Sequence, residues 1–175
     1  YNNSISIGYF SSNHNNNISI GYKSGENIFD EKNILIGTNT GQNCITNNLI
    51  FGNKNGRFLG KDNTLFGENL CKNNNGNYNT LVGYDICQLN SSNNTIIGYS
   101  NASLISGNNN IIIGNNNINN NKTNLNNCIT LGYHCLKNES NEYNNIFEIR
   151  NKQKYILGNI NDNTLDIYGN ITIKN

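Results

Sequence analysis

The chain has 175 residues and a formal net charge of +1, and asparagine makes up more than a quarter of it. It contains 17 Gly but no Pro, Met or Trp, and only 13% of its residues are charged. The 12 Lys and Arg residues are scattered singly, whereas duplex nucleic acid is bound by clustered cations. No apolar run approaches the roughly 20 residues that span a bilayer. We therefore expect no nucleic-acid partner and no membrane insertion, and the regular placement of Ile favours order over disorder.

A short apolar segment that ends in glycine recurs along the first three quarters of the chain. The first copy is Ser-Ile-Ser-Ile-Gly8, and a later one is Asn-Thr-Ile-Ile-Gly98. Successive repeat glycines are 13 to 18 residues apart. Nine copies at nearly constant spacing predict a solenoid of stacked short strands. The repeat glycines are Gly8, Gly21, Gly37, Gly52, Gly67, Gly83, Gly98, Gly114 and Gly132.

Each segment alternates as a strand does. The residue immediately before the glycine (the pre-glycine position) is always apolar, and the residue three before it (the strand-start position) is Ile, Leu or Thr. This period of two predicts that both positions face the core. The residue two before the glycine (the mid-strand position) is then expected on the outer face, as an apolar stripe that needs cover. The stripe would comprise Leu35, Ile50, Leu65, Leu81, Ile96 and Ile112.

Asparagine occupies the position four before the glycine (the ladder position) in seven of the nine copies. Asn tolerates left-handed turns, and stacked amides can bond one another from coil to coil. The recurrent glycine indicates a backbone angle, or a close approach to a neighbour, that other residues do not tolerate. The ladder residues are Asn17, Asn33, Asn48, Asn63, Asn79, Asn94 and Asn110.

The repeat length defines the fold class. A coil of 15–16 residues holds about two short strands and two turns. We therefore predict an all-β fold, a narrow two-sided parallel β-roll of about nine coils over residues 1–138, rising roughly 4.8 Å per coil. After residue 138 simple alternation replaces the repeat, and we predict that residues 139–175 form a C-terminal β cap or neck.

No residue set indicates catalysis, a metal site or a cofactor. His134 beside Cys135 invites a nucleophile–base pair, but adjacent residues of a strand point to opposite faces. The carboxylates do not recur at one repeat position, so the paired acids of a glycosidase are not indicated. Five Cys without a CxxC pair favour small buried thiols.

The longest glycine spacing, 18 residues, contains an asparagine-rich run. We predict that residues 115–127 bulge from the coil, because binding loops project from rigid scaffolds. The candidate recognition residues are Asn115, Asn117, Asn119, Asn121 and Lys122.

The run Asn-Thr-Ile-Ile-Gly98-Tyr99-Ser100 and its eight relatives resemble the head repeat of trimeric autotransporter adhesins. They are still more similar to repeats of phage and giant-virus tail-fibre proteins. The resemblance covers about residues 1–137 and implies a left-handed β-roll that associates as a homotrimer. Residues 163–172 resemble the stretch that precedes an endosialidase-type, self-cleaving intramolecular chaperone. Since the chain begins with Tyr1, we expect it to be part of a longer product.

The repeat and the resemblance together predict a non-enzymatic fibre or adhesin head for surface attachment or display. Such a domain would lie outside the cell, on a virion or cell-surface fibre. Its partners would be further copies of itself and a cell-surface glycan or protein receptor. Two alternatives remain open: a fibre-borne carbohydrate-active enzyme, and a self-assembling architectural filament protein.

Overall fold

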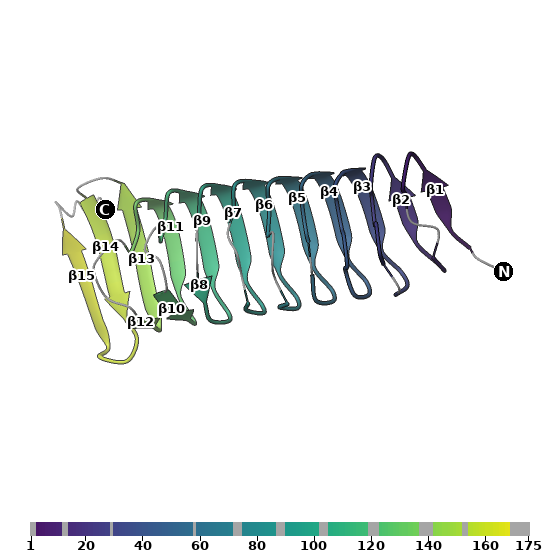
Figure 1. The fold of residues 1–175 in the computed structure, drawn as a ribbon. Coiled ribbons are helices and arrows are strands. Elements are labelled where there is room, and N and C mark those ends of the chain that lie inside the picture. Colours follow the sequence, from purple (N-terminus) through teal and green to yellow (C-terminus); the bar gives the residue numbers. More distant parts are fainter. Residues whose placement is uncertain are drawn as a thin grey trace, which may run out of the picture.

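The computed structural model describes residues 3–11, 14–28, 30–57, 59–71, 75–86, 90–101, 105–118, 123–136, 142–151 and 154–168. Twelve strands form one sheet in the order β1-β2-β3-β4-β5-β6-β7-β9-β11-β13-β14-β15, and β12, β10 and β8 form a second (Figure 1). No described segment is a helix able to cross a membrane. The strands are β1 (Ile5–Ile7), β2 (Ile18–Ile20), β3 (Ile34–Thr38), β4 (Leu49–Asn53), β5 (Thr64–Glu68), β6 (Thr80–Tyr84), β7 (Thr95–Tyr99), β8 (Ile105–Ser106), β9 (Ile111–Asn115), β10 (Thr123–Asn126), β11 (Ile129–Tyr133), β12 (Glu142–Asn144), β13 (Ile146–Asn151), β14 (Lys154–Asn159) and β15 (Thr164–Tyr168).

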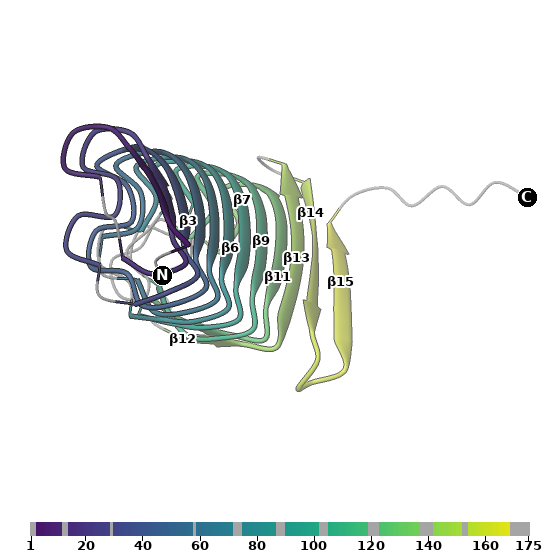
Figure 2. The ribbon, with the colours of Figure 1, turned by 90° about the vertical axis from the view of Figure 1, so that its right-hand side faces the viewer.

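The predicted parallel stack is confirmed. Every neighbouring pair from β1 to β13 in the large sheet is parallel. The register places Gly52 beside Gly67 and Gly67 beside Gly83, so the repeat glycines form one column. Figure 2 looks along the stack and shows the coils overlying one another, with the large sheet along one side. The chain is therefore a β-solenoid.

The other side of the coil is less regular than the two strands per coil that the repeat length predicts. Strand pairing on that side is confined, among the described residues, to the three short strands β8, β10 and β12. Elsewhere bends stack through single main-chain hydrogen bonds between coils. Gly25 N–H donates to Thr40 O at 2.8 Å and Gly41 N–H donates to Asn55 O at 2.9 Å. These bends keep the coil short and satisfy the backbone without a continuous second sheet.

The corners of the coil favour asparagine. In successive coils the residue before the ladder position and the second residue after the glycine have positive φ, for example 60° at Asn47 and 52° at Asn39. This left-handed conformation is least costly for Gly, Asn and Asp. Non-glycine residues that adopt it at these corners include Asn16, Asn39, Asn47, Asn69, Asn93, Asn109, Asn116 and Asn127.

The strand faces are the reverse of the sequence prediction. The mid-strand residues Leu35, Ile50, Leu65, Leu81, Ile96 and Ile112 are fully buried and form the core column of the sheet. The pre-glycine and strand-start residues point outward instead, as Ile97 and Ile111 do. The prediction was wrong because both sets are apolar, so alternation alone does not identify the inner one. The ladder position, the mid-strand position and the glycine are two residues apart in turn, so all three face inward.

The C-terminal end changes from parallel to antiparallel pairing. β13 is still parallel to β11, with Leu131 beside Ile149. Antiparallel pairing begins only between β13 and β14 and continues to β15. Arg150 stands beside Gly132 in the column of repeat glycines, and its other neighbour, Tyr155, belongs to an antiparallel strand. The glycine repeat thus ends one strand before the parallel stack does.

Candidate functional surfaces

The predicted ladder residues form a buried column of amides. All seven are at most 1% exposed. The Oδ1 atom of Asn48 accepts the main-chain N–H of Asn63 at 3.0 Å and its Nδ2 at 3.2 Å. Asn48 Nδ2 also donates to Gly60 O at 2.9 Å. Each interior amide thus satisfies buried donors of the next coil, which makes the column a structural element and not a ligand site.

A second amide ladder lies three residues after some of the repeat glycines, and it was not predicted from the sequence. Asn101 Nδ2 donates to Ile97 O at 3.1 Å and to Gly114 O at 2.7 Å. Its Oδ1 accepts the N–H of Asn117 at 3.0 Å. Asn55 makes the equivalent bonds. The recurrence of Asn three residues after the glycine in three copies was the available signal.

The repeat glycines are required by this close stacking. Gly67 has a φ of 141°, and a Cβ built on it would overlap the carbonyl oxygen of Gly83. The same relationship holds between Gly83 and Gly98 and between Gly98 and Gly114. Any side chain at these positions would push two coils apart as well as strain the backbone.

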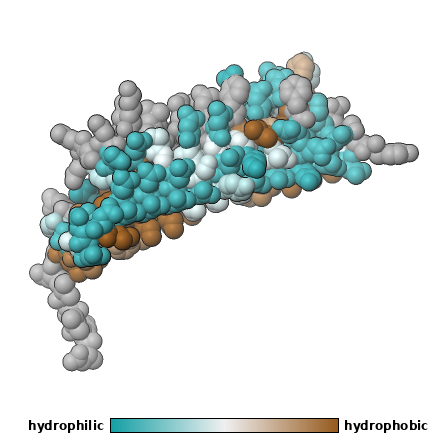
Figure 3. Space-filling view, turned by 90° about the horizontal axis from the view of Figure 1, so that it is seen from below, coloured by the Kyte–Doolittle hydropathy of each residue, from teal (hydrophilic) through white to brown (hydrophobic). Residues whose placement is uncertain are grey.

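The outer face of the large sheet carries an apolar residue at the pre-glycine position of every coil, and we call it the outer sheet face. It is formed by the pre-glycine and strand-start positions of β1 to β13, where Ile97 and Ile113 are each 37% exposed. In Figure 3 apolar residues line the lower edge, whereas the side turned to the viewer is mainly hydrophilic. The exposed large apolar residues of this face in β1 to β13 are Ile5, Ile7, Ile34, Phe66, Val82, Ile97, Ile111, Ile113, Ile129 and Ile149.

Two further features extend the outer sheet face. Aromatic rings stack along it between coils, with centroids 4.8 Å apart for Phe51 and Phe66 and 5.6 Å apart for Tyr84 and Tyr99. On the antiparallel side, Ile149 pairs through β14 with Ile167 of β15, which is 43% exposed. The face therefore continues without a break from the parallel stack onto the C-terminal hairpin.

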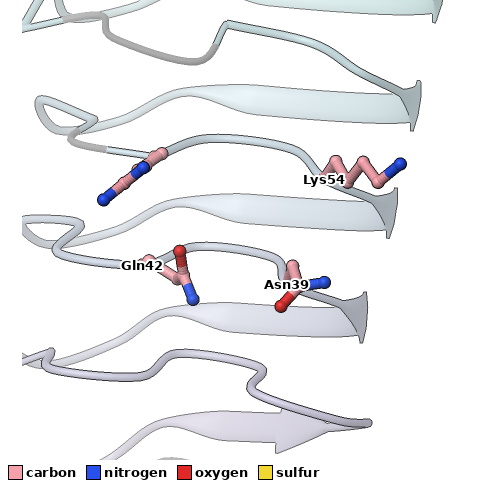
Figure 4. A pocket seen from close by; sticks show the side chains of 4 residues that line it. Asn39, Gln42 and Lys54 are labelled. Atoms are coloured by element: carbon pink, nitrogen blue, oxygen red, sulfur yellow. The ribbon is translucent and has the colours of Figure 1, made fainter.

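A pocket of about 200 Å³ opens between two consecutive coils on the bend side (Figure 4). It is lined by Asn39 and Gln42 from one coil and by Lys54 and Arg57 from the next. Each pair occupies the second and fifth positions after its repeat glycine, so stacking brings together residues 15 apart in the sequence. The lining combines two cations with two amides, and none of the four residues was predicted from the sequence as part of a site.

The candidate recognition residues do not form one loop in the described part of the chain. Asn115 is exposed at the end of β9. Asn117 is buried in the second ladder, where its Oδ1 accepts Cys135 N–H at 2.9 Å. Asn117 is thus committed to the scaffold, and its assignment to a recognition loop was wrong. Asn119, Asn121 and Lys122 lie outside the described residues.

The core becomes polar at its C-terminal end. Glu148 continues the core column beside Thr130, with its side chain only 4% exposed. Its Oε2 accepts Leu136 N–H at 2.8 Å, and its Oε1 lies 3.4 Å from Arg150 Nε. Burial raises the pKa of Glu148. The carboxylate closes the last coil by accepting a main-chain donor that no further coil would reach.

The neighbouring His134–Cys135 pair lacks the electrostatics of a nucleophilic site. Burial, with a smaller contribution from the charge of Glu148, raises the pKa of the Cys135 thiol to about 12. An activated cysteine has a lowered pKa instead. The His134 ring stacks on Tyr133, with centroids 3.8 Å apart. Among the described residues no three His, Cys, Asp or Glu side chains gather as a metal site.

No protein-family model matches the chain, and neither a curated protein nor a solved structure shows significant similarity to it. The geometry of the solenoid therefore carries the functional argument.

Proposed function

We propose that this chain is a non-enzymatic structural domain, a fibre shaft or adhesin head, that associates as a homotrimer through the outer sheet face. In this role three rigid solenoids pack side by side and display their bends to the surroundings, on the surface of a virion or a cell. The observation that carries the proposal is the continuous apolar face on a sheet whose other face already covers a complete core.

The size of this face supports association. Twelve strands spaced about 4.8 Å apart make a sheet roughly 50 Å long. The outward positions from strand start to the residue after the glycine span about 13 Å along each strand. The product, roughly 700 Å², is close to the area of about 800 Å² that one chain contributes to a single standard interface, and in a trimer it would be shared between two neighbouring chains. A face of this size and composition is rarely left in water by a monomeric protein.

Repetition makes the face suited to identical partners. Each coil adds the same outward positions at the same spacing, so one copy presents a regular ridge that another copy can match along its length. The number three comes from the resemblance of the repeat to trimeric fibre heads.

Multi-angle light scattering tests the proposal, combined with circular dichroism. We expect a β-rich species of three times the 19.5 kDa chain mass. The double variant Ile97→Lys/Ile113→Lys should be monomeric, because burying two unpaired charges in an apolar interface is costly. The matched control Asn75→Lys/Asn90→Lys adds the same charge at exposed polar positions and should remain trimeric.

A wild-type monomer at tens of micromolar would contradict the proposal. A dimer would contradict the number three while retaining a covered face, and open filaments would support the architectural alternative.

A further inference from the structure

We propose that the pocket between the third and fourth coils binds a single carboxylated sugar unit, such as a uronic or sialic acid at the end of a glycan. The site lies within one chain and does not require association, but its use for attachment rests on the proposed function. The proposal stands on the pocket's lining, its size and the charges that surround it.

The lining matches the two kinds of group that an acidic sugar carries. Lys54 and Arg57 are both exposed and contribute two positive charges, and guanidinium binds planar carboxylate through a fork of parallel N–H donors. Asn39 and Gln42 contribute primary amides, which both donate to and accept from hydroxyl groups. A neutral sugar offers no negative charge to the cations, and a bare sulfate offers no hydroxyl donor to the amide oxygens.

The scaffold fixes the main chain at two of these residues and the side chain of a third. The main chain at Asn39 and Lys54 lies at left-handed corners, and Lys54 N–H donates to Thr38 O at 2.9 Å. Gln42 Nε2 donates to Glu26 Oε2 at 2.8 Å. In Figure 4 the Gln42 nitrogen therefore points to the coil below, and its oxygen points toward the coil that carries Lys54. That oxygen is positioned to accept a hydroxyl group in the pocket.

The size limits the ligand to one sugar unit. The volume of the pocket is about 200 Å³. It is smaller than the 300–1,000 Å³ typical of pockets for drug-sized ligands. The rest of a glycan would extend into solvent.

The surrounding charges limit the ligand to one anionic group. On one side Glu26 is 3.6 Å from Lys23 Nζ, so this pair adds no net charge. On the other side, the second position after the repeat glycine is held by Asn39 and Lys54 and, in the next two coils, by Asn69 and Asp85. The Asp85 carboxylate accepts a hydrogen bond from Asn69 Nδ2 at 2.6 Å. Carboxylates thus flank the pocket on both sides. A polyanion such as nucleic acid would meet a carboxylate two coils away and is not favoured.

Titration of the whole chain by NMR and calorimetry tests this assignment. The probes are the methyl glycoside of a uronic acid, the matching neutral methyl glycoside, and inorganic sulfate, all at about 0.15 M ionic strength, where long-range attraction is screened. We expect saturable binding of the uronic acid with shifts at the amides of Asn39, Gln42, Lys54 and Arg57. Binding of the neutral glycoside and of sulfate should be at least tenfold weaker.

Matched variants separate a site from general attraction. Lys54→Gln/Arg57→Gln should weaken uronic-acid binding at least tenfold. Lys32→Gln/Lys61→Gln removes the same charge at the opposite corner of the coil and should change it less than twofold. Equal losses in the two variants, equal binding of the neutral glycoside, or equal binding of sulfate would each overturn the assignment. The Lys54→Gln/Arg57→Gln variant should keep the wild-type mass in light scattering and the wild-type melting temperature. A loss of ligand binding in this variant is then distinct from a failure of the trimer.

Discussion

The side-chain oxygen of Asn63 accepts two hydrogen bonds from Asn79, one from its main-chain N–H at 2.9 Å and one from its Nδ2 at 3.1 Å. The two residues are 16 apart in the chain and directly stacked in the solenoid. Their relationship repeats along the core, so polar groups hold the coils in register inside an apolar stack.

Asn63→Ala should be severely destabilising. It removes the acceptor of two buried donors, and each buried donor left without a partner costs about 1–3 kcal/mol. We expect a loss of about 3–5 kcal/mol in urea unfolding followed by circular dichroism. Asn75→Ala, at an exposed position, should change the midpoint by no more than about 0.5 kcal/mol. Similar effects for the two variants would contradict a structural role for the ladder.

Gly67→Val should disrupt its coil and lower the melting temperature by more than about 10 °C. The new Cβ would overlap the Gly83 carbonyl, and valine tolerates a positive φ poorly. Asp62→Asn serves as control, because Asn also adopts the left-handed conformation found there and exposes a similar side chain. If thermal melts showed equal tolerance of both changes, the close approach of the coils would be refuted.

Ile96 and Ile97 test the assignment of the two faces. Ile96 is fully buried, so Ile96→Ala should cost about 2–5 kcal/mol at any protein concentration. Ile97 is 37% exposed in the single chain, so Ile97→Ala should act mainly through association. Unfolding curves recorded over a hundredfold range of concentration distinguish the two effects. A concentration-independent loss in Ile97→Ala equal to that in Ile96→Ala would contradict the face assignment.

Glu148 should make stability depend on pH. Burial raises its pKa in the folded state above the unfolded value of about 4.3. The stability that this group contributes is therefore fully present below about pH 4.3 and is lost as pH rises through the folded pKa. Glu148→Gln is neutral at every pH and still offers an acceptor to Leu136 N–H. We expect this variant to gain stability relative to wild type between pH 4 and pH 8.

Urea unfolding at several pH values measures this difference, with Glu31→Gln at an exposed site as the matched control. A stability difference between Glu148→Gln and wild type that does not change with pH would show that burial does not govern the carboxyl group.

The thiols of Cys44 and Cys135 should resist alkylation in the folded protein. Burial is the main cause that raises the pKa of each to about 12, and thiolate is the reactive form. Iodoacetamide at pH 8, followed by mass spectrometry of peptides, should label neither residue within minutes and both in urea. Rapid labelling of Cys135 in the native state would reopen the case for a reactive His134–Cys135 pair.

Several elements of the fold follow from the sequence. Nine glycine-terminated segments predicted the parallel stack, and the Asn at the ladder position predicted the amide column, because both need only the spacing of residues along the chain. The predicted inner and outer faces were reversed because neighbouring residues such as Ile96 and Ile97 are equally apolar. The pocket was not predictable either, since Gln42 and Arg57 meet only when their coils stack.

The amino-acid sequence by itself determined that a short strand with alternating residues recurs once per coil, because the type and spacing of residues are read directly along the chain. Only the tertiary structure decided which of two apolar faces became the core. The face that carries the ladder asparagine and the glycine turned inward, since only stacked coils satisfy those amides and admit that close backbone contact. The opposite face, which also carries an apolar residue in every coil, remains exposed on the single chain.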